Sequence, residues 1–284
     1  MRTAVHEPLP GPIVHPPRGE LPVLLSVPHA GRDYPDWLVA MSRCGLKALR
    51  PLEDPFVDRL VWRALRHGIG AVIARAPRAA VDCNRAEDEI DPISVHGRPL
   101  PSERPSARAR GGLGIVPSRT AMHGHLWRRS ISYGDLGQRL ADVHRPYHDA
   151  IAASLDDLVR GFGCALLIDC HSMPPAAAGA EIVFGDRYGR SAAPWLVATA
   201  SQIAAEKGFS AAVNDPFAGG HVVERHGAPH LGIHALQIEI DRDLYLTSGG
   251  EPGSEFDRVA ALVETTALEL GRQLLDRRLA EAAE

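Results

Sequence analysis

The stretch ALLIDCHS, residues 165–172, joins a run of apolar residues to a polar tail. Four consecutive apolar residues predict a buried strand over 165–168. Asp169, Cys170 and His171 follow this run directly. A buried strand that leads into such side chains is typical of the carboxyl edge of an open α/β sheet, where ligands bind.

Three further apolar runs predict strands, over 23–27, 71–74 and 236–240. Apolar residues recur at helical spacing in the segments between them and at the end of the chain, over 57–65, 136–147, 196–204 and 259–274. Strands that alternate with helices predict an α/β fold, in which helices cover both faces of the sheet.

The length and composition favour a single domain over residues 1–284. Hydrophobic residues make up 45% of the 284 residues, which is enough for a substantial core, and no internal repeat divides the chain. Residues 1–20 are rich in proline and are expected to be irregular. Residues 88–129 are rich in Pro, Gly and Arg, and we expect a long loop near the site there.

Charge and cysteine content exclude several classes of protein. The net charge is −4 with 23% charged residues, which argues against disorder and against a nucleic-acid partner. The four cysteines have no CxxC spacing, unlike a secreted disulfide framework. The N-terminus has no signal-peptide core, and no run approaches the ~20 apolar residues of a membrane span. We therefore expect a soluble, cytoplasmic protein that binds no membrane.

Every predicted strand leads into polar side chains that are suited to chemistry. These side chains are His29 after the first strand, Arg78, Asn84 and Arg85 after the second, His171 after the third, and Glu239 within the fourth. Because the carboxyl ends of parallel strands meet at one edge of a sheet, we expect these groups to converge. Two imidazoles with several carboxylates are the groups that a hydrolytic zinc site needs.

The expected metal is Zn²⁺, although another divalent ion fits the same kind of ligand. His29 and His171 are the predicted nitrogen ligands, and Asp54 is the predicted carboxylate ligand, with Glu53 or Asp58 as alternatives. Each of these residues also has a plainer interpretation. Either histidine could be a hydrogen-bonded structural group, and Asp54 could cap the helix that follows it.

Glu239 is the predicted general base, because a carboxylate at a buried strand end can take a proton from water. Its alternative role is that of an outward-facing residue on an alternating strand. Cys170 beside His171 suggests a cysteine hydrolase at first sight. However, neighbours on a strand point to opposite faces, so these two residues cannot easily act as nucleophile and base together.

Six motifs in this order resemble those of the N-formylglutamate amidohydrolase family. They are PHAG at 28–31, EDPFVDRL at 53–60, VDCNR at 81–85, DCHSMP at 169–174, NDPFAGGH at 214–221 and QIEI at 237–240. The resemblance extends over about residues 20–275. It implies a fold like that of zinc carboxypeptidases and aspartoacylases, a three-layer α/β/α arrangement with a mixed, mostly parallel central sheet.

The resemblance also implies roles for individual residues. His29 and His171 match the two histidine ligands, Glu239 matches the catalytic glutamate, and the Asn84-Arg85 pair matches the residues that bind a substrate carboxylate or carbonyl. The chain departs from the carboxypeptidase pattern at one position. Arg32 stands three residues after the first histidine, where carboxypeptidases have their carboxylate ligand.

The implied reaction converts N-formyl-L-glutamate and water to formate and L-glutamate, a step of histidine degradation. Two substrate carboxylates need two cationic partners. The candidates are Arg85 first and then Arg78, Arg187 and Arg225, with His221 as a further substrate contact and Arg85 also as a partner of the reacting oxygen. Two alternatives remain open: hydrolysis of another N-acyl amino acid or short peptide, and a non-catalytic carboxylate-binding protein on the same fold.

Overall fold

The computed structural model describes residues 7–97 and 106–283. Residues 1–6 of the predicted irregular segment 1–20, and residues 98–105 of the predicted loop 88–129, lie outside it. The chain divides into two compact units. The first unit is Met1–Pro12, His29–Glu53 and Ala74–His148, and the second is Ile13–Pro28, Asp54–Ile73 and Asp149–Glu284. Each unit combines three separate segments of the chain. The expectation of a single domain over 1–284 stays a prediction.

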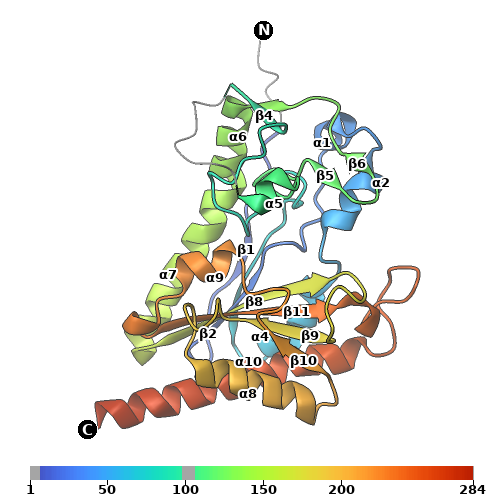
Figure 1. The fold of residues 1–284 in the computed structure, drawn as a ribbon. Coiled ribbons are helices and arrows are strands. Elements are labelled where there is room, and N and C mark those ends of the chain that lie inside the picture. The colour runs from blue at the N-terminus through green and yellow to red at the C-terminus, as the bar shows by residue number, and fades with distance from the viewer. Residues whose placement is uncertain (1–6, 98–105, 284) are drawn as a thin grey trace. The chain divides into compact units, whose positions relative to one another are not determined.

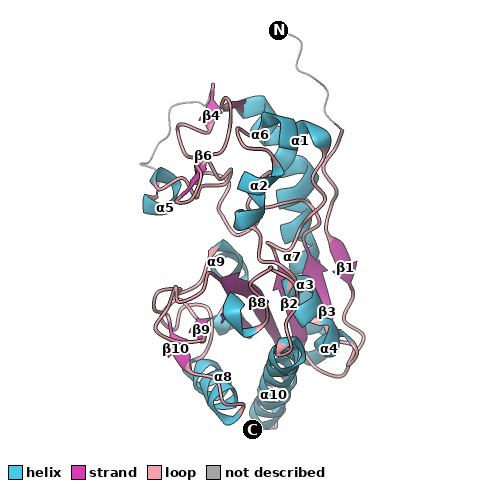
Figure 2. Cartoon of the chain, turned by 90° about the vertical axis from the view of Figure 1, so that its right-hand side faces the viewer, coloured by secondary structure: helices cyan, strands magenta, loops and turns pink. Residues whose placement is uncertain are grey.

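The second unit contains a seven-stranded sheet (Figures 1 and 2). Its strands in spatial order are β1 (Ile13–His15), β3 (Gly70–Ile73), β2 (Val23–Val27), β8 (Ala165–Met173), β11 (Ile233–Asp241), β9 (Ile182–Gly185) and β10 (Ala211–Val213). β1 runs antiparallel to β3 and β9 runs antiparallel to β11, whereas all other neighbours are parallel. This confirms the mixed, mostly parallel sheet.

β8 lies in the middle of the sheet, and all nine of its residues are buried. A strand covered on both faces is expected to be apolar, and Ala165–Ile168 fits that rule. The predicted end of the strand at Ile168 is wrong, because pairing with β11 continues through Asp169 and His171 to Met173. The ladder continues there because these polar side chains find hydrogen-bond partners inside the protein.

Helices cover both faces of this sheet, as predicted. They are α3 (Val57–Leu60), α4 (Trp62–Leu65), α7 (Arg145–Phe162, of which the first four residues belong to the first unit), α8 (Pro194–Glu206), α9 (His221–His226) and α10 (Phe256–Ala282), with the 3₁₀ turns η3 (Pro229–Leu231) and η4 (Arg242–Leu244). α8 and α10 pack together below the sheet in Figure 1, whereas α9 contacts β8 and β11 from above. The second unit therefore has three layers.

The first unit has only short elements. Its helices are α1 (Asp36–Met41), α2 (Leu46–Leu49), the 3₁₀ turn η1 (Arg50–Leu52), α5 (Ala107–Arg110), α6 (Tyr133–Arg139) and the π-helical turn η2 (Leu140–His144); its strand pairs are β4 (Val95–His96) with β7 (Ile131–Ser132) and β5 (Arg119–Thr120) with β6 (Gly124–His125). α6 begins at a capping box, in which Ser132 and Asp135 each bind the other's backbone N–H.

Part of the N-terminal segment forms a strand. Residues 13–15 form β1 within the segment expected to be irregular, because Ile13 and Val14 pair with Ile73 and Val72 at the edge of the sheet.

Within residues 7–97 and 106–283, no helix combines the length and the apolar character that crossing a bilayer requires.

Candidate functional site

Four polar residues share one face of β8 and β11. Glu239 lies opposite His171, and Gln237 lies opposite Asp169. Side chains two residues apart on a strand point to the same face, so the register brings these four side chains together, and all four are buried. Cys170 points to the other face, and burial raises the pKa of its thiol, which argues against a cysteine nucleophile.

His171 lies between two carboxylates. Its Nε2 is 2.8 Å from Asp169 Oδ2, and its Nδ1 is 3.0 Å from Asp54 Oδ2. The other carboxylate oxygens accept hydrogen bonds from the Ser26 hydroxyl, at 2.7 Å, and from Arg242 Nη2, at 3.0 Å. Burial alone would lower the pKa of His171, but the two aspartates hold it well above its usual value. An imidazole oriented by a carboxylate is typical of a metal ligand.

Glu239 is held by its neighbour on the same strand. Gln237 Nε2 donates to Glu239 Oε1 at 2.9 Å, and Gln237 Oε1 accepts the backbone N–H of Gly220 at 2.8 Å. The preceding residue, Gly219, has φ = +116°, and an added Cβ atom would lie 2.7 Å from a Val223 methyl group. The turn therefore requires glycine, and it is anchored next to the predicted base.

In the first unit, His29 also has an aspartate partner. His29 Nε2 lies 2.7 Å from Asp82 Oδ1, which also accepts the backbone N–H of Asn84 at 2.8 Å. Arg78 Nε donates to the other oxygen of Asp82 at 2.8 Å. Burial alone would raise the pKa of Asp82, but Arg78, His29 and Arg85 hold it well below its usual range. Asp82 therefore orients both His29 and Arg78.

Arg85 is buried beside this pair. Its Nε donates to the Leu113 carbonyl at 2.8 Å, and its Nη1 donates to the Asn84 carbonyl at 2.7 Å. Burial lowers the pKa of the guanidinium, although Asp82 partly offsets this effect. Within the described residues, Nη2 makes no hydrogen bond, so one face of the fork could serve a carboxylate ligand.

Two histidines in the first unit hold the backbone around Arg85. His144 Nε2 lies 2.8 Å from the Arg85 carbonyl, and His148 Nε2 lies 2.9 Å from the Cys83 carbonyl. Because a carbonyl only accepts hydrogen bonds, both rings carry their proton on Nε2 when they are neutral. The Asn84-Arg85 segment is therefore fixed from both sides of its backbone.

The predicted carboxylate ligand and its alternatives occupy different surroundings. Asp54 contacts His171 directly. Glu53 belongs to the first unit, where its Oε1 accepts a hydrogen bond from the Tyr34 hydroxyl at 2.7 Å. Asp58 is half-buried on α3. Of the three carboxylates, Asp54 is the one that the structure places on a predicted histidine ligand.

The remaining substrate-binding candidates lie outside the strands of the sheet. Arg187 forms an ion pair with Glu224, and its backbone N–H donates to Ala218 at 2.7 Å. His221 is half-buried at the start of α9, and Arg225 is exposed on the same helix. The structure therefore joins His171, Asp54 and Glu239 within the second unit, but it does not bring Arg187 or Arg225 into hydrogen-bond contact with them.

Sequence reasoning did not connect three residues to the histidine or glutamate that each of them orients. Asp169 and Gln237 orient His171 and Glu239, and Asp82 orients His29. The signal for the first two was their spacing, because each lies two residues before its partner on the same strand. Asp82 lies 53 residues from His29, and no local pattern joins them.

Known proteins resemble this chain over most of its length. The family model of N-formylglutamate amidohydrolase matches residues 21–246. N-formylglutamate deformylases of Pseudomonas putida and Pseudomonas aeruginosa are both 31% identical, covering 94% and 93% of this chain and 96% and 94% of their own lengths. The crystal structure of N-formylglutamate amidohydrolase from Ralstonia eutropha superimposes with a TM-score of 0.85 at 29% identity, over 93% of this chain and 98% of that one. This chain therefore belongs to the N-formylglutamate amidohydrolase family.

Proposed function

We propose that this protein is a zinc-dependent amidohydrolase that converts N-formyl-L-glutamate and water to formate and L-glutamate. The observation that carries the chemistry is the pairing of His171, with Asp54 on its Nδ1, beside Glu239 on the neighbouring strand. The substrate is supported by the two deformylases that match almost the whole chain. The proposed substrate is a small molecule with two carboxylates, and the cytoplasm is the proposed location of the enzyme.

The proposed zinc ligands are His29, Asp54 and His171. Imidazole nitrogen and carboxylate oxygen are groups that zinc prefers, and both imidazoles have an aspartate on Nε2, which is how a carboxylate commonly orients a histidine ligand. His29 enters this set from its position in the sequence, two residues after the end of β2. The carboxylates on both nitrogens of His171 support the fit, because negative charge around the ring attracts a metal cation.

When it is bound, zinc supplies a Lewis acid that polarises the formyl carbonyl and lowers the pKa of water. In our proposal, Glu239 takes a proton from the attacking water and delivers it to the leaving nitrogen of glutamate. The hydrogen bond from Gln237 to Oε1 fixes the position of the carboxylate for this transfer.

Recognition of the two substrate carboxylates is assigned first to Arg85, with Asn84 beside it. Nη2 of Arg85 is available for one carboxylate, since Nε and Nη1 already bind carbonyl groups. Arg78 and Arg187 are committed to ion pairs with Asp82 and Glu224, which favours Arg225 as the second cation. His221, at the start of α9, is the proposed neutral contact.

A substrate panel on zinc-loaded protein tests the proposal. We expect kcat/KM to be highest for N-formyl-glutamate, lower for N-formyl-glutamine and lower still for N-formyl-methionine. Arg85→Lys keeps the charge but cannot bind the Leu113 and Asn84 carbonyls and a substrate carboxylate together, so we expect a loss of about 1.5–3 kcal/mol in transition-state binding of N-formyl-glutamate.

The matched control is Arg145→Lys, which changes an exposed arginine that pairs with Glu87 in the same unit. Its kcat/KM should equal that of the wild type. Equal rates on all three substrates would refute the formylglutamate assignment and would leave an amidohydrolase of another N-acyl amino acid. Absence of hydrolysis on every substrate, with zinc bound, would instead favour a carboxylate-binding protein.

A further inference from the structure

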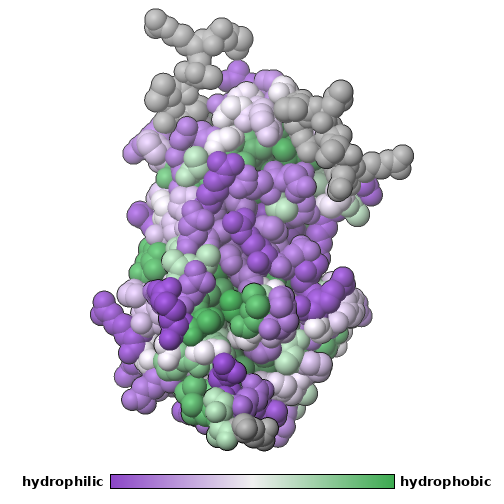
Figure 3. All heavy atoms as spheres, turned by 90° about the vertical axis from the view of Figure 1, so that its left-hand side faces the viewer, coloured by the Kyte–Doolittle hydropathy of each residue, from purple (hydrophilic) through white to green (hydrophobic). Residues whose placement is uncertain are grey.

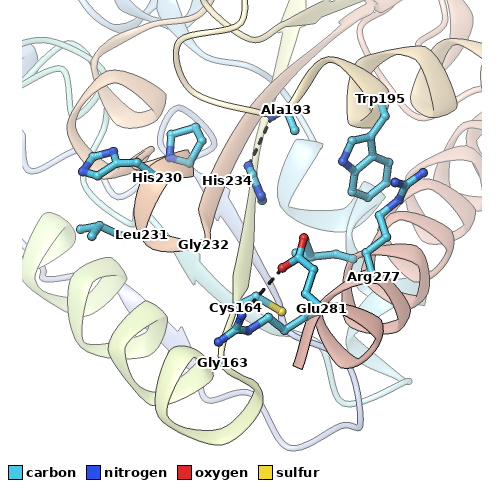
Figure 4. Close-up of a pocket in the computed structure, with 13 residues that line it drawn as sticks. Gly163, Cys164, Ala193, Trp195, His230, Leu231, Gly232, His234, Arg277 and Glu281 are labelled. Atoms are coloured by element: carbon cyan, nitrogen blue, oxygen red, sulfur yellow. Dashed lines mark hydrogen bonds and ion pairs between the residues drawn. The ribbon is translucent and has the colours of Figure 1, made fainter. Parts of the chain in front are cut away.

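A cavity of about 510 Å³ lies within the second unit, at the amino ends of β8 and β11 (Figure 4). Cys164 and Gly163 line it just before β8, and His234 lines it from the start of β11. α8, the C-terminal part of α10 and the turn η3 line the rest of it. Its volume falls within the range of small-molecule sites.

This cavity is separate from the proposed catalytic site. Seven positions along β8 separate Cys164 from His171, and at 3.3 Å per residue they span about 23 Å. His234 likewise lies five positions before Glu239 on β11. A ligand of amino-acid size in the cavity therefore cannot reach the residues assigned to catalysis.

A buried histidine in the wall presents a hydrogen-bond donor to the cavity. His234 is 9% exposed, and its Nδ1 accepts the backbone N–H of Ala193 at 3.3 Å. Burial lowers the pKa of this imidazole, although Glu281 partly offsets the effect, so the ring is neutral near pH 7. Because Nδ1 accepts, the proton lies on Nε2, which makes no hydrogen bond within residues 7–97 and 106–283.

α10 places two guanidinium groups and one carboxylate at the opening. Arg277 stacks over the Trp195 ring, 4.4 Å from its centroid, and finds no carboxylate partner in the described part of the chain. Arg278 Nη1 lies 3.7 Å from Glu281 Oε2, an exposed and therefore weak ion pair. Figure 4 shows the Glu281 carboxylate between His234 and Cys164, and Arg277 to the right of it beside Trp195. The stacked guanidinium keeps its N–H edge for a carboxylate.

The surface around the opening also has apolar character. The C-terminal end of α10 lies on the side of Figure 1 that faces the viewer in Figure 3, where apolar side chains gather between hydrophilic ones. Leu231, which lines the cavity, is 63% exposed. Leu231 and the Trp195 ring can therefore cover the methylene groups of a ligand whose charged ends contact α10.

We propose that this cavity binds an acidic amino acid at a site distinct from the catalytic one. Two guanidinium groups match its two carboxylates, the Glu281 carboxylate matches its ammonium group, and the His234 Nε2–H supplies a neutral donor to one carboxylate. The charges of Arg277, Arg278 and Glu281 sum to +1, which complements the net charge of −1 on such a ligand. The inference stands apart from the proposed hydrolysis, because none of these residues belongs to the catalytic set.

The indole N–H of Trp195 gives a local readout of binding. In ¹H–¹⁵N spectra of the full chain, with the resonance identified through Trp195→Phe, we expect a saturable shift when L-glutamate is added. Glutarate lacks the ammonium group and L-glutamine lacks the second carboxylate, so each should bind about 10-fold more weakly or worse. Arg277→Gln and Glu281→Gln should weaken the response to L-glutamate by a similar factor.

Arg272→Gln is the control, because Arg272 is an exposed arginine on the same helix that pairs with Glu269 and lies outside the cavity. Its titration should match that of the wild type, as should the titration of His171→Ala, which changes only the catalytic site. An indole resonance that does not respond to L-glutamate would overturn the proposal. Equal affinity for glutarate would overturn the assignment of Glu281. A normal indole titration in a protein that hydrolyses no N-formyl-glutamate would refute the proposed function and leave this site standing.

Discussion

The two units each hold one histidine in place through an aspartate, but the charged groups closest to the two rings differ. In the first unit, His29 contacts Asp82, which is also bound by Arg78 and lies near Arg85. In the second unit, His171 contacts two carboxylates and has Glu239 as a further anionic neighbour. Both histidines are held by the same kind of hydrogen bond to an aspartate, but the other charged groups near the two rings differ.

The difference separates two tasks. Arginines around Asp82 keep that carboxylate ionised and leave cationic groups next to a histidine, which suits an anionic substrate. In our proposal, the carboxylates around His171 attract a metal cation instead. The lesson is that an aspartate–histidine pair alone does not specify a role, and that the charges next to it do.

The largest expected effect comes from removing either imidazole. His171→Ala and His29→Ala should each abolish stoichiometric zinc binding and reduce formate release below detection, because each removes a proposed ligand. Metal analysis and a formate assay measure both quantities, and far-UV circular dichroism checks the fold. His230→Ala, at an exposed histidine, is the control. If one variant kept full zinc binding and full activity while the other lost both, the two histidine–aspartate pairs would not be equivalent.

The next effect separates the base from the ligands. Glu239→Gln preserves shape and the possibility of a hydrogen bond to Gln237, so zinc content should be unchanged. The rate should fall by ~10² or more, because the variant cannot accept the proton of water. Glu251→Gln, at an exposed glutamate, should be neutral. A Glu239→Gln enzyme with near-normal turnover would remove Glu239 from the mechanism.

A smaller effect is expected from the aspartates that orient the histidines. Asp169→Asn and Asp82→Asn should each lower zinc affinity or activity by about 10–100-fold, the usual range for residues behind a ligand. Competition with a chromogenic chelator measures the affinity. Asp82→Asn should in addition raise KM for N-formyl-glutamate, because the Asn84 backbone N–H loses its carboxylate acceptor next to Arg85. Unchanged zinc affinity in both variants would mean that the aspartates serve only folding.

The smallest effect concerns His226, a buried histidine of α9 that has Arg225 and His221 among its charged neighbours. Burial first, and then Arg225 and His221, lower the pKa of His226 to about 4. The unfolded chain binds this proton near pH 6.5, so His226 contributes full stability above pH 6.5 and loses it as the pH falls towards 4. Between pH 7.5 and 5 the loss is about 2 kcal/mol.

Urea unfolding at these two pH values, in wild type and His226→Gln, measures that contribution. The variant should be less stable at pH 7.5 but should lose less stability on acidification. Equal losses in both proteins would contradict the depressed pKa. His171 provides the contrast, since carboxylate neighbours raise its pKa instead.

Runs of apolar residues in the sequence predicted several strands of the sheet. The strand over 23–27 has the predicted bounds, and the strands at 71–74 and 236–240 differ by one to three residues. These runs are buried because parallel strands in the middle of a sheet are covered on both faces. The position of His29 after such a run was therefore predictable, and so was that of Glu239 within one.

Long-range pairing could not be read from the sequence. β9 and β10 are short, and β9 joins the sheet antiparallel to a strand about 50 residues away. The predicted end of β8 at Ile168 placed Asp169 in a loop, which concealed that it shares a face with His171. Buried hydrogen bonds keep these polar residues in the strand, and their partners, Ser26 and Asp54, lie more than 100 residues away.

The pairing of β2 with β8 has a consequence for synthesis of the protein. The two strands are neighbours in the sheet, yet β8 ends 146 residues after β2. A ribosome that adds 5–20 residues per second needs roughly 7 to 30 s to make the intervening chain. During that time β2 and its partner β3 lack β8, the strand that pairs with the other edge of β2. Strand edges and apolar faces that stay exposed in this way aggregate readily. The nascent chain should therefore depend on chaperones that bind extended apolar segments until Met173 has emerged.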